Sequence, residues 1–151
     1  MRAWSLLGAC LLASIHGVAA GNDVSYLSDP LPVGMQKVSM AASAKEYRMD
    51  AARHVYAAYA PRIYKGRLPP LIHGVVVVET GVDASGRTRD VTLIRGSKHA
   101  PDVSAAVVEM IRRASPLPAP SRMTAGTRFI EIWLVHRNGR FQLDALTEGQ
   151  D

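Results

Sequence analysis

Apolar residues recur at helical spacing in two segments of the chain, residues 43–59 and residues 101–114. The apolar positions of the first segment are Tyr47, Ala51, Ala52, Val55, Tyr56 and Tyr59. Ser43, with Glu46 three residues later, is typical of a capped helix N-terminus, and Pro61 limits the other end. The apolar positions of the second segment are Val103, Ala106, Val107, Met110, Ile111 and Ala114. Both segments are therefore predicted to be amphipathic helices.

β-Branched and aromatic residues concentrate in three other segments, residues 72–82, 88–95 and 127–136, which we predict to be strands. Asp83 and Gly86 fit the first and fourth positions of a type I turn, so the first two strands are expected to form a hairpin. The dipeptide Asn138-Gly139 predicts a second tight turn after the third strand. Residues 141–143 then return as a short fourth strand.

The order of these elements predicts an α+β fold with two layers. Its antiparallel sheet has three to four strands, and the two helices pack on one face of that sheet. We place this domain at residues 43–146, with a tail at residues 147–151. Residues 21–42 contain Asp29-Pro30 and show little periodicity, so we expect a flexible tether there.

The strands are apolar on both faces, whereas a sheet with one face in water usually alternates apolar and polar residues. Alternation predicts that one set faces the helices: Val76, Val78, Val82, Val91, Leu93, Ile130, Ile132 and Leu134. The opposite set is Val75, Val77, Ile94, Phe129, Trp133 and Val135. Such a second apolar face indicates a partner protein, a dimer contact or a covering segment of the same chain.

The strand at 127–136 is followed only by a short hairpin, so we expect it to lie at an edge of the sheet. An edge strand has unpaired backbone groups and can accept an extended peptide as an added strand. The predicted partner-binding residues are accordingly Phe129, Ile130, Glu131, Ile132, Trp133, Leu134, Val135 and His136.

The first twenty residues have the character of a targeting segment. Arg2 is followed by an uncharged stretch at residues 3–20, which ends in the small residues Val18-Ala19-Ala20. We expect a cleaved signal peptide and a periplasmic location, and the alternative is a single, marginal inner-membrane anchor. Cys10 is the only cysteine of the chain, so cleavage after Ala20 leaves a mature domain without a thiol.

The charge and the aromatic content argue against nucleic-acid binding. The formal net charge is +5, but the basic residues are spread along the chain, and only 6% of the residues are aromatic. Peripheral attraction to anionic lipid or to an acidic peptide fits this balance better.

Residue types that carry catalysis are present but scattered. No two histidines have metal-ligand spacing. We expect His54 to be a solvated or half-buried side chain and His136 to be the polar end of a strand. Ser97, Lys98 and His99 lie in a loop before the second helix, where an anion or only a polar connection is expected. Glu79 and Glu131 are either cross-strand neighbours or partners of arginines, with Arg89 and Arg128 as the candidates. We therefore predict no enzyme, no cofactor and no metal.

Three stretches of the chain resemble the C-terminal domain of the TonB/TolA energy-transducer family, over about residues 44–145. They are "GVVVVETGVDASGRTRDVTLIRGS", "DVSAAVVEMIRRASPLPAPS" and "RFIEIWLVHRNG". The family combines a strand, an Asp-x-x-Gly turn, a second strand and a helix that ends in a "PLP" stretch. The positions that match this pattern are Asp83, Gly86, Ala106, Ile111, Ala114, Pro116, Leu117 and Pro118.

The resemblance implies a periplasmic interaction module that links envelope partners in energy-dependent transport. In TonB-like members the last strand pairs with a short peptide of an outer-membrane receptor, which corresponds here to about residues 129–136. The implied partner is therefore a peptide segment of an outer-membrane receptor or of another envelope protein. The alternative is a self-associating structural envelope domain, for example a homodimer, without energy transduction.

Overall fold

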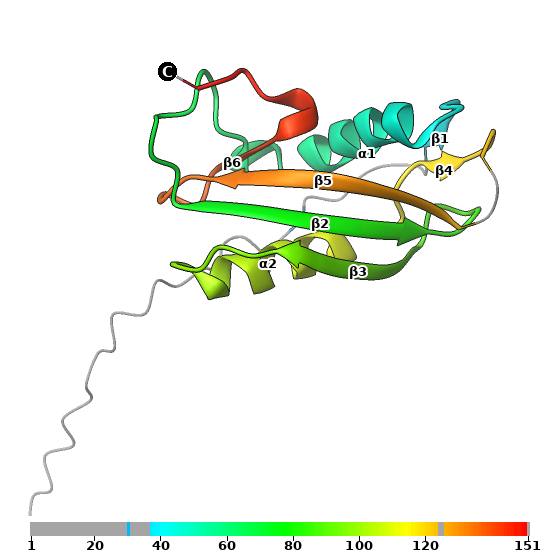
Figure 1. Ribbon diagram of the computed structural model, residues 1–151. Coiled ribbons are helices and arrows are strands. Elements are labelled where there is room, and N and C mark those ends of the chain that lie inside the picture. Colours follow the sequence, from blue (N-terminus) through cyan, green and yellow to red (C-terminus); the bar gives the residue numbers. More distant parts are fainter. Residues whose placement is uncertain (1–29, 31–36, 124–125, 151) are drawn as a thin grey trace, which may run out of the picture.

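A sheet of four antiparallel strands carries two helices on one face in the computed structural model, which describes residues 30, 37–123 and 126–150 (Figure 1). The strand order is β3-β2-β5-β6, and a small parallel sheet pairs β1 with β4. This confirms the predicted α+β class with two helices and a four-stranded antiparallel sheet. The elements are β1 (Val38–Ser39), α1 (Ala44–Ala58), η2 (Ala60–Arg62), β2 (Gly74–Val82), β3 (Thr88–Arg95), α2 (Pro101–Arg113), β4 (Ala119–Pro120), β5 (Thr127–Val135), β6 (Phe141–Leu143) and η3 (Asp144–Leu146).

The ends of α1 follow from its sequence. The Ser43 hydroxyl accepts a hydrogen bond from the Glu46 backbone N–H at 3.3 Å, as expected of an N-cap residue. The Glu46 carboxylate in turn accepts from the N–H of Ala42 at 2.7 Å. At the other end Pro61 disfavours further α-helix, and the chain tightens into the 3₁₀ turn η2.

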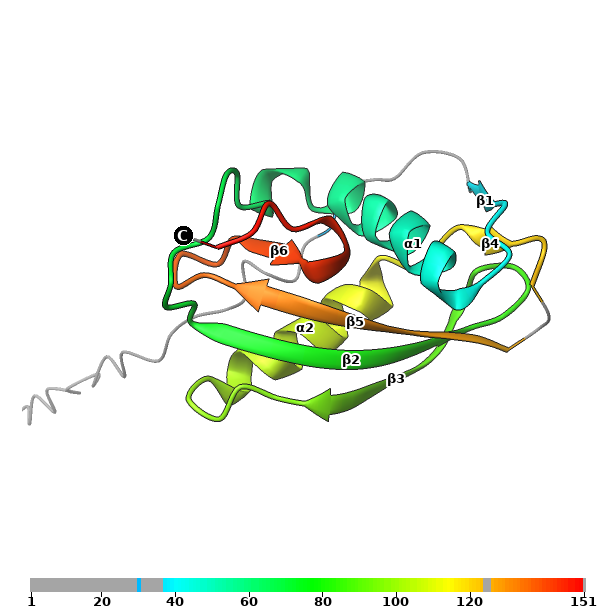
Figure 2. The same ribbon diagram turned by 45° about the horizontal axis from the view of Figure 1, so that its top comes forward.

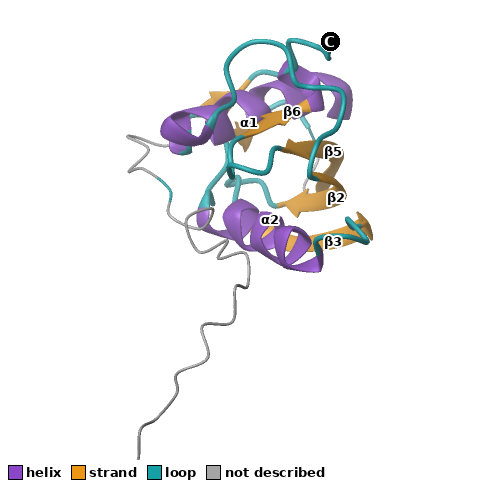
Figure 3. Cartoon of the chain, turned by 90° about the vertical axis from the view of Figure 1, so that its left-hand side faces the viewer, coloured by secondary structure: helices purple, strands orange, loops and turns teal. Residues whose placement is uncertain are grey.

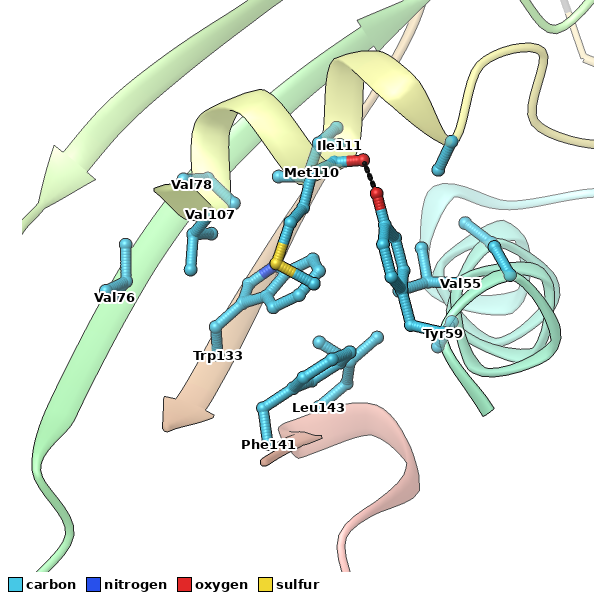
Figure 4. Packing of buried hydrophobic residues seen from close by; sticks show 14 of the residues in the cluster. Val55, Tyr59, Val76, Val78, Val107, Met110, Ile111, Trp133, Phe141 and Leu143 are labelled. Carbon is cyan, nitrogen blue, oxygen red and sulfur yellow. Dashed lines mark hydrogen bonds between the residues drawn. The ribbon is translucent and has the colours of Figure 1, made fainter. Parts of the chain in front are cut away.

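The core lies between the helices and the sheet, and its largest fully buried side chains are aromatic (Figure 4). The Trp133 and Phe141 rings pack with their centroids 4.7 Å apart. Tyr59 is buried, and its hydroxyl donates to the Met110 carbonyl oxygen at 2.9 Å, which links α1 to α2. Burial of several such rings is a large apolar contribution to stability.

The predicted faces are right for β2 and wrong for β5. Val76 and Val78 are fully buried on the helix side. In β5, however, the residues turned toward the helices are Phe129, Glu131, Trp133 and Val135. The other face of β5 carries Ile130, Ile132 and Leu134. The reason is the register of the sheet, because Glu131 lies opposite buried Val78 and a shift of one residue exchanges the two faces of a strand.

Two segments expected to lie outside the domain are packed against it. Val38 and Ser39 form β1, within the expected tether, and Ser39 is buried beside Asp50 with its hydroxyl 2.6 Å from that carboxylate. At the C-terminus, the Leu68 N–H donates to the Gly149 carbonyl oxygen at 2.9 Å. The predicted signal or anchor segment and most of the tether lie outside the described residues.

The turn between β2 and β3 takes the predicted form and also contacts the proline-rich loop. The Gly86 N–H donates to the Asp83 carbonyl oxygen at 3.0 Å, and Gly86 has a positive φ of 81°. Its own carbonyl oxygen accepts from the Leu117 N–H at 2.8 Å. A Cβ atom at this position would lie 2.0 Å from the Leu117 carbonyl oxygen, so the contact requires glycine.

We expect Gly86→Ala to lower the free energy of unfolding by about 3 kcal/mol or more, because backbone strain and a collision with the Leu117 carbonyl add together. Gly66→Ala is the matched control, since Gly66 also has a positive φ but no atom within 4 Å of its Cβ position. It should cost only about 1 kcal/mol. Urea unfolding of both variants measures the difference, and equal losses would contradict the contact.

Candidate protein-interaction surface

Strand β5 is not the outer edge that the sequence indicated. It pairs with β2 along its whole length, and β6 pairs with its last three residues, Trp133–Val135 (Figure 2). The Asn138-Gly139 hairpin folds β6 back onto the side where a partner strand was expected. His136 continues this pairing, since its N–H donates to the Arg140 carbonyl oxygen at 2.8 Å. A peptide cannot add along residues 133–136.

The predicted partner-binding residues consequently fall into two groups. The four residues in the core are Phe129, Glu131, Trp133 and Val135, each no more than 9% exposed. The four on the opposite side are Ile130, Ile132, Leu134 and His136, which are half-buried or exposed. The side chains of the second group lie on the sheet surface, where they are open to a partner, and β6 pairs with Trp133–Val135 but not with residues 129–132.

Glu131 is a buried carboxylate with a structural environment. Its Oε1 atom lies 2.7 Å from Nη2 of Arg48 in α1 and accepts the N–H of Ile132 at 2.9 Å. The same Arg48 nitrogen is 2.6 Å from the Asp144 carboxylate in η3. The hydrogen bond to Glu131 raises the pKa of the Arg48 guanidinium, although partial burial opposes this. The cluster joins α1, β5 and η3, with one guanidinium shared by two carboxylates. The other Glu131 oxygen, Oε2, is buried without a hydrogen-bond partner.

The two glutamates proposed as a possible pair lie on opposite faces of the sheet. Glu79 is opposite Ile130, whereas Glu131 is opposite Val78. Glu79 instead meets Arg128 at 3.0 Å, and Arg128 also binds Asp90 at 2.8 Å. Pairing with Arg128 is therefore correct for Glu79, whereas Glu131 pairs with Arg48, which was not among the candidates, and the two glutamates do not form a carboxylate pair.

The two edge strands of the sheet are β3 and β6. The outer side of β6 is bridged by Ile63 at Phe141, whereas β3 has β2 as its one strand partner among the described residues. The ladder shows which of its groups point outward. His136 N–H points to β6, so the backbone groups of the preceding residue of β5, and of every second residue before it, point to β2. The β2 residues opposite these direct their own backbone groups to β5 and therefore away from β3. Val91 and Leu93, opposite Thr80 and Val78, therefore direct their N–H and C=O groups away from the sheet.

We call this outer side of β3 the rim. A face of the sheet without helices adjoins it (Figure 3). It is apolar along its centre, where cross-strand pairs place apolar side chains together: Val75, Val77, Ile132 and Leu134 are half-buried, and Ile94 and Ile130 are exposed. Ile94 is 52% exposed and Ile130 is 48% exposed. We call these six residues the open face. A group of apolar side chains on a sheet face without helices is typical of interaction sites.

The sequence predicted a second apolar face, correctly for the residues of β2 and for Ile94 but not for those of β5, and it did not indicate the β3 rim. The available signal was the position of β3 in the chain, between a hairpin and a helix, which leaves it one neighbour in the sheet unless a later strand joins it. The exposed pair Leu93 and Ile94 is a second signal, because edge strands that stay unpaired usually carry charge there.

Metal-ligating residue types and one buried histidine complete the description of the titratable groups. No group of three or more His, Cys, Asp or Glu side chains is placed to hold a metal ion there. His54 is buried on α1, with its Nε2 atom 2.9 Å from the Ala114 carbonyl oxygen, and burial lowers its pKa. The described helices include none that is both long and apolar enough to cross a membrane.

Comparisons of this chain with protein-family models, with curated proteins and with solved structures found no match.

Removal of Arg48 should leave the buried Glu131 carboxylate without its cation. We expect Arg48→Met to lower the free energy of unfolding by about 2 to 3 kcal/mol, somewhat less than for a fully buried pair, because the Arg48 side chain is 27% exposed. Arg53→Met is the control on the same helix, since the exposed Arg53–Asp50 pair should be worth less than about 1 kcal/mol.

A double-mutant cycle with Glu131→Gln tests the coupling itself. The double variant Arg48→Met/Glu131→Gln should cost clearly less than the sum of the single variants, because the second change neutralises the charge that the first leaves unpaired. Free energies of unfolding from urea titrations that simply add would contradict the proposed role of the pair.

Proposed function

We propose that this domain is a protein-interaction module that binds an extended segment of a partner as an additional strand on β3. The observation that carries the proposal is the unpaired rim of β3, where Val91 and Leu93 direct backbone donors and acceptors outward. An extended segment can satisfy these groups by continuing the ladder of the sheet.

The open face supports the same proposal. Side chains of an added strand alternate between the two faces of the sheet, so half of them would lie on the helix-free side beside Ile94 and Thr92. The backbone then supplies affinity without regard to sequence, while the apolar side chains of the open face favour apolar residues in the partner.

The resemblance to the TonB/TolA C-terminal domains provides the proposed setting. There the module is periplasmic and links envelope partners in energy-dependent transport, and its ligand is a segment of an outer-membrane receptor or another envelope protein. For this chain we place the added strand at β3 rather than at residues 129–136, because β6 already occupies the end of β5.

Self-association is the second candidate, and the exposed apolar side chains Ile94 and Ile130 favour it. Two copies can pair through their β3 rims or through their open faces. Sedimentation of the full chain over a range of concentrations distinguishes this reading, because a chain that stays monomeric at all concentrations contradicts it.

Proline in place of Leu93 tests the rim directly. Leu93 N–H points outward, so Leu93→Pro removes a donor from the rim but no hydrogen bond between β2 and β3. We expect this variant to lose a partner that wild type captures by crosslinking in envelope fractions. The control Leu93→Thr loses the same apolar side chain but keeps the N–H, and it should retain the partner.

Thermal unfolding of both variants separates binding from folding. The two should unfold within a few degrees of each other, since an outward-facing proline is tolerated in an edge strand. Equal capture by Leu93→Pro and wild type, with both folded, would show that the rim is not the binding site.

A further inference from the structure

A hollow of about 490 Å³ opens at the end of the sheet where β2 begins and β3 ends. Its polar wall contains His73 before β2, Arg95 at the end of β3, and Lys98 and His99 in the loop that leads to α2. Its apolar part consists of Ile72 and Val75, and Val75 continues into the open face. Neither the proposed strand addition nor the ion pairs of the domain use this hollow.

The charge of the hollow is of one sign. No carboxylate lines it, and within the described residues the side chains of Arg95 and Lys98 have no ion pair. Elsewhere in the domain Arg48, Arg113 and Arg128 each bind a carboxylate within 3.0 Å. Two unpaired cations beside two imidazoles make a local positive potential that attracts anions.

The loop that carries Lys98 and His99 is fixed by contacts with α2. The Ser97 N–H donates to the hydroxyl of Ser104, a buried residue in the first half of α2, at 3.0 Å. Gly96 passes so close that an added Cβ would lie 2.9 Å from the same hydroxyl oxygen. A fixed backbone reduces the ordering cost of binding at Lys98 and His99.

We propose that this hollow is a binding site for the phosphate group of a phosphate ester. Arg95 offers five N–H donors and Lys98 offers three, and each imidazole offers at least one more. A carboxylate has two acceptor oxygens in one plane, whereas the four oxygens of a phosphate lie on a tetrahedron, of which three are free of ester bonds in a monoester and two in a diester. The volume exceeds that of a phosphate group alone, so the organic part of the ester lies against Ile72 and Val75.

Two sources can supply this chemistry, a soluble phosphate ester or the headgroup of an anionic phospholipid. Both place a phosphate among the side chains of His73, Arg95, Lys98 and His99. They differ in whether the organic part of the ester is free in solution or belongs to a membrane lipid. The site does not depend on strand addition, because its groups are side chains at the end of the sheet and not the outward backbone of Val91 and Leu93.

The test uses the full chain with two probes. Inorganic phosphate is titrated while backbone amide resonances are followed by NMR, with sodium chloride at matched ionic strength as the reference. Sedimentation with phosphatidylglycerol vesicles is compared with sedimentation with phosphatidylcholine vesicles. The variant Arg95→Gln/Lys98→Gln removes two charges from the hollow. Lys45→Gln/Arg87→Gln removes two charges from α1 and from the turn at the opposite end of the sheet.

We expect inorganic phosphate to shift the amides of residues 96–99 saturably, and the hollow variant to bind at least about tenfold more weakly. The distant-charge variant should bind like wild type. Selective sedimentation with phosphatidylglycerol, lost only in the hollow variant, assigns the site to a lipid headgroup. Phosphate binding without vesicle binding assigns it to a soluble ester.

Three results would overturn the proposal. The first is the lack of any response to either probe in a folded wild-type chain. The second is equal weakening by both variants, which would mean that net charge alone attracts the probes. The third is an identical amide response to sodium chloride, which would mean that the shifts report ionic strength. The amide spectra of the variants show directly whether each is folded.

Discussion

The ion pair between Glu131 and Arg48 determines how the two layers of the domain fit together. A carboxylate that is 3% exposed requires a cation and hydrogen-bond donors, and here they come from α1, from the next backbone N–H of β5 and from η3. All of these contacts are made by the Oε1 atom, and they position α1 over β5 and bring the C-terminal turn against both. The aromatic packing of Trp133, Tyr59 and Phe141 then fills the space that this arrangement defines.

The same interaction explains which parts of the fold the sequence could predict. Helix ends, strand limits and turns depend on local chemistry, and Ser43, Gly86 and the Asn138-Gly139 turn indicated them correctly. The face of β5 depends on register with β2, and there the polar residue was misleading. A glutamate in a strand usually marks the solvent side, but Glu131 marks the core because Arg48, distant in sequence, neutralises it.

For the candidate site, the existence of a second apolar face followed from the composition of β2, where Val75 and Val77 have no polar alternation. Which strand lies at the edge did not follow, because it depends on how three residues of β6 compete with a partner for one side of β5. Strand β6 forms few hydrogen bonds, but its pairing within the same chain avoids the entropy cost of associating with a separate molecule. The chain's own strand therefore occupies that position. The rim of β3 stays without a strand partner because the segment that follows β3 leads away from the sheet into α2.

That outcome places three different surfaces next to one another. The rim of β3 offers backbone groups, the open face beside it offers apolar side chains, and the hollow at its end offers unpaired cations. Helices cover only one side of the sheet, and of the residues that define these surfaces Val91 packs against the core. Substitutions of the exposed residues, such as Leu93, Ile94 and Lys98, change binding with little effect on folding. Arg95 belongs both to the last position of β3 and to the hollow, so a strand added along the full rim would pass beside the anion site. Occupancy of one surface by a charged ligand therefore alters the electrostatic environment of the other, and an acidic partner segment would compete with a bound phosphate rather than tolerate it.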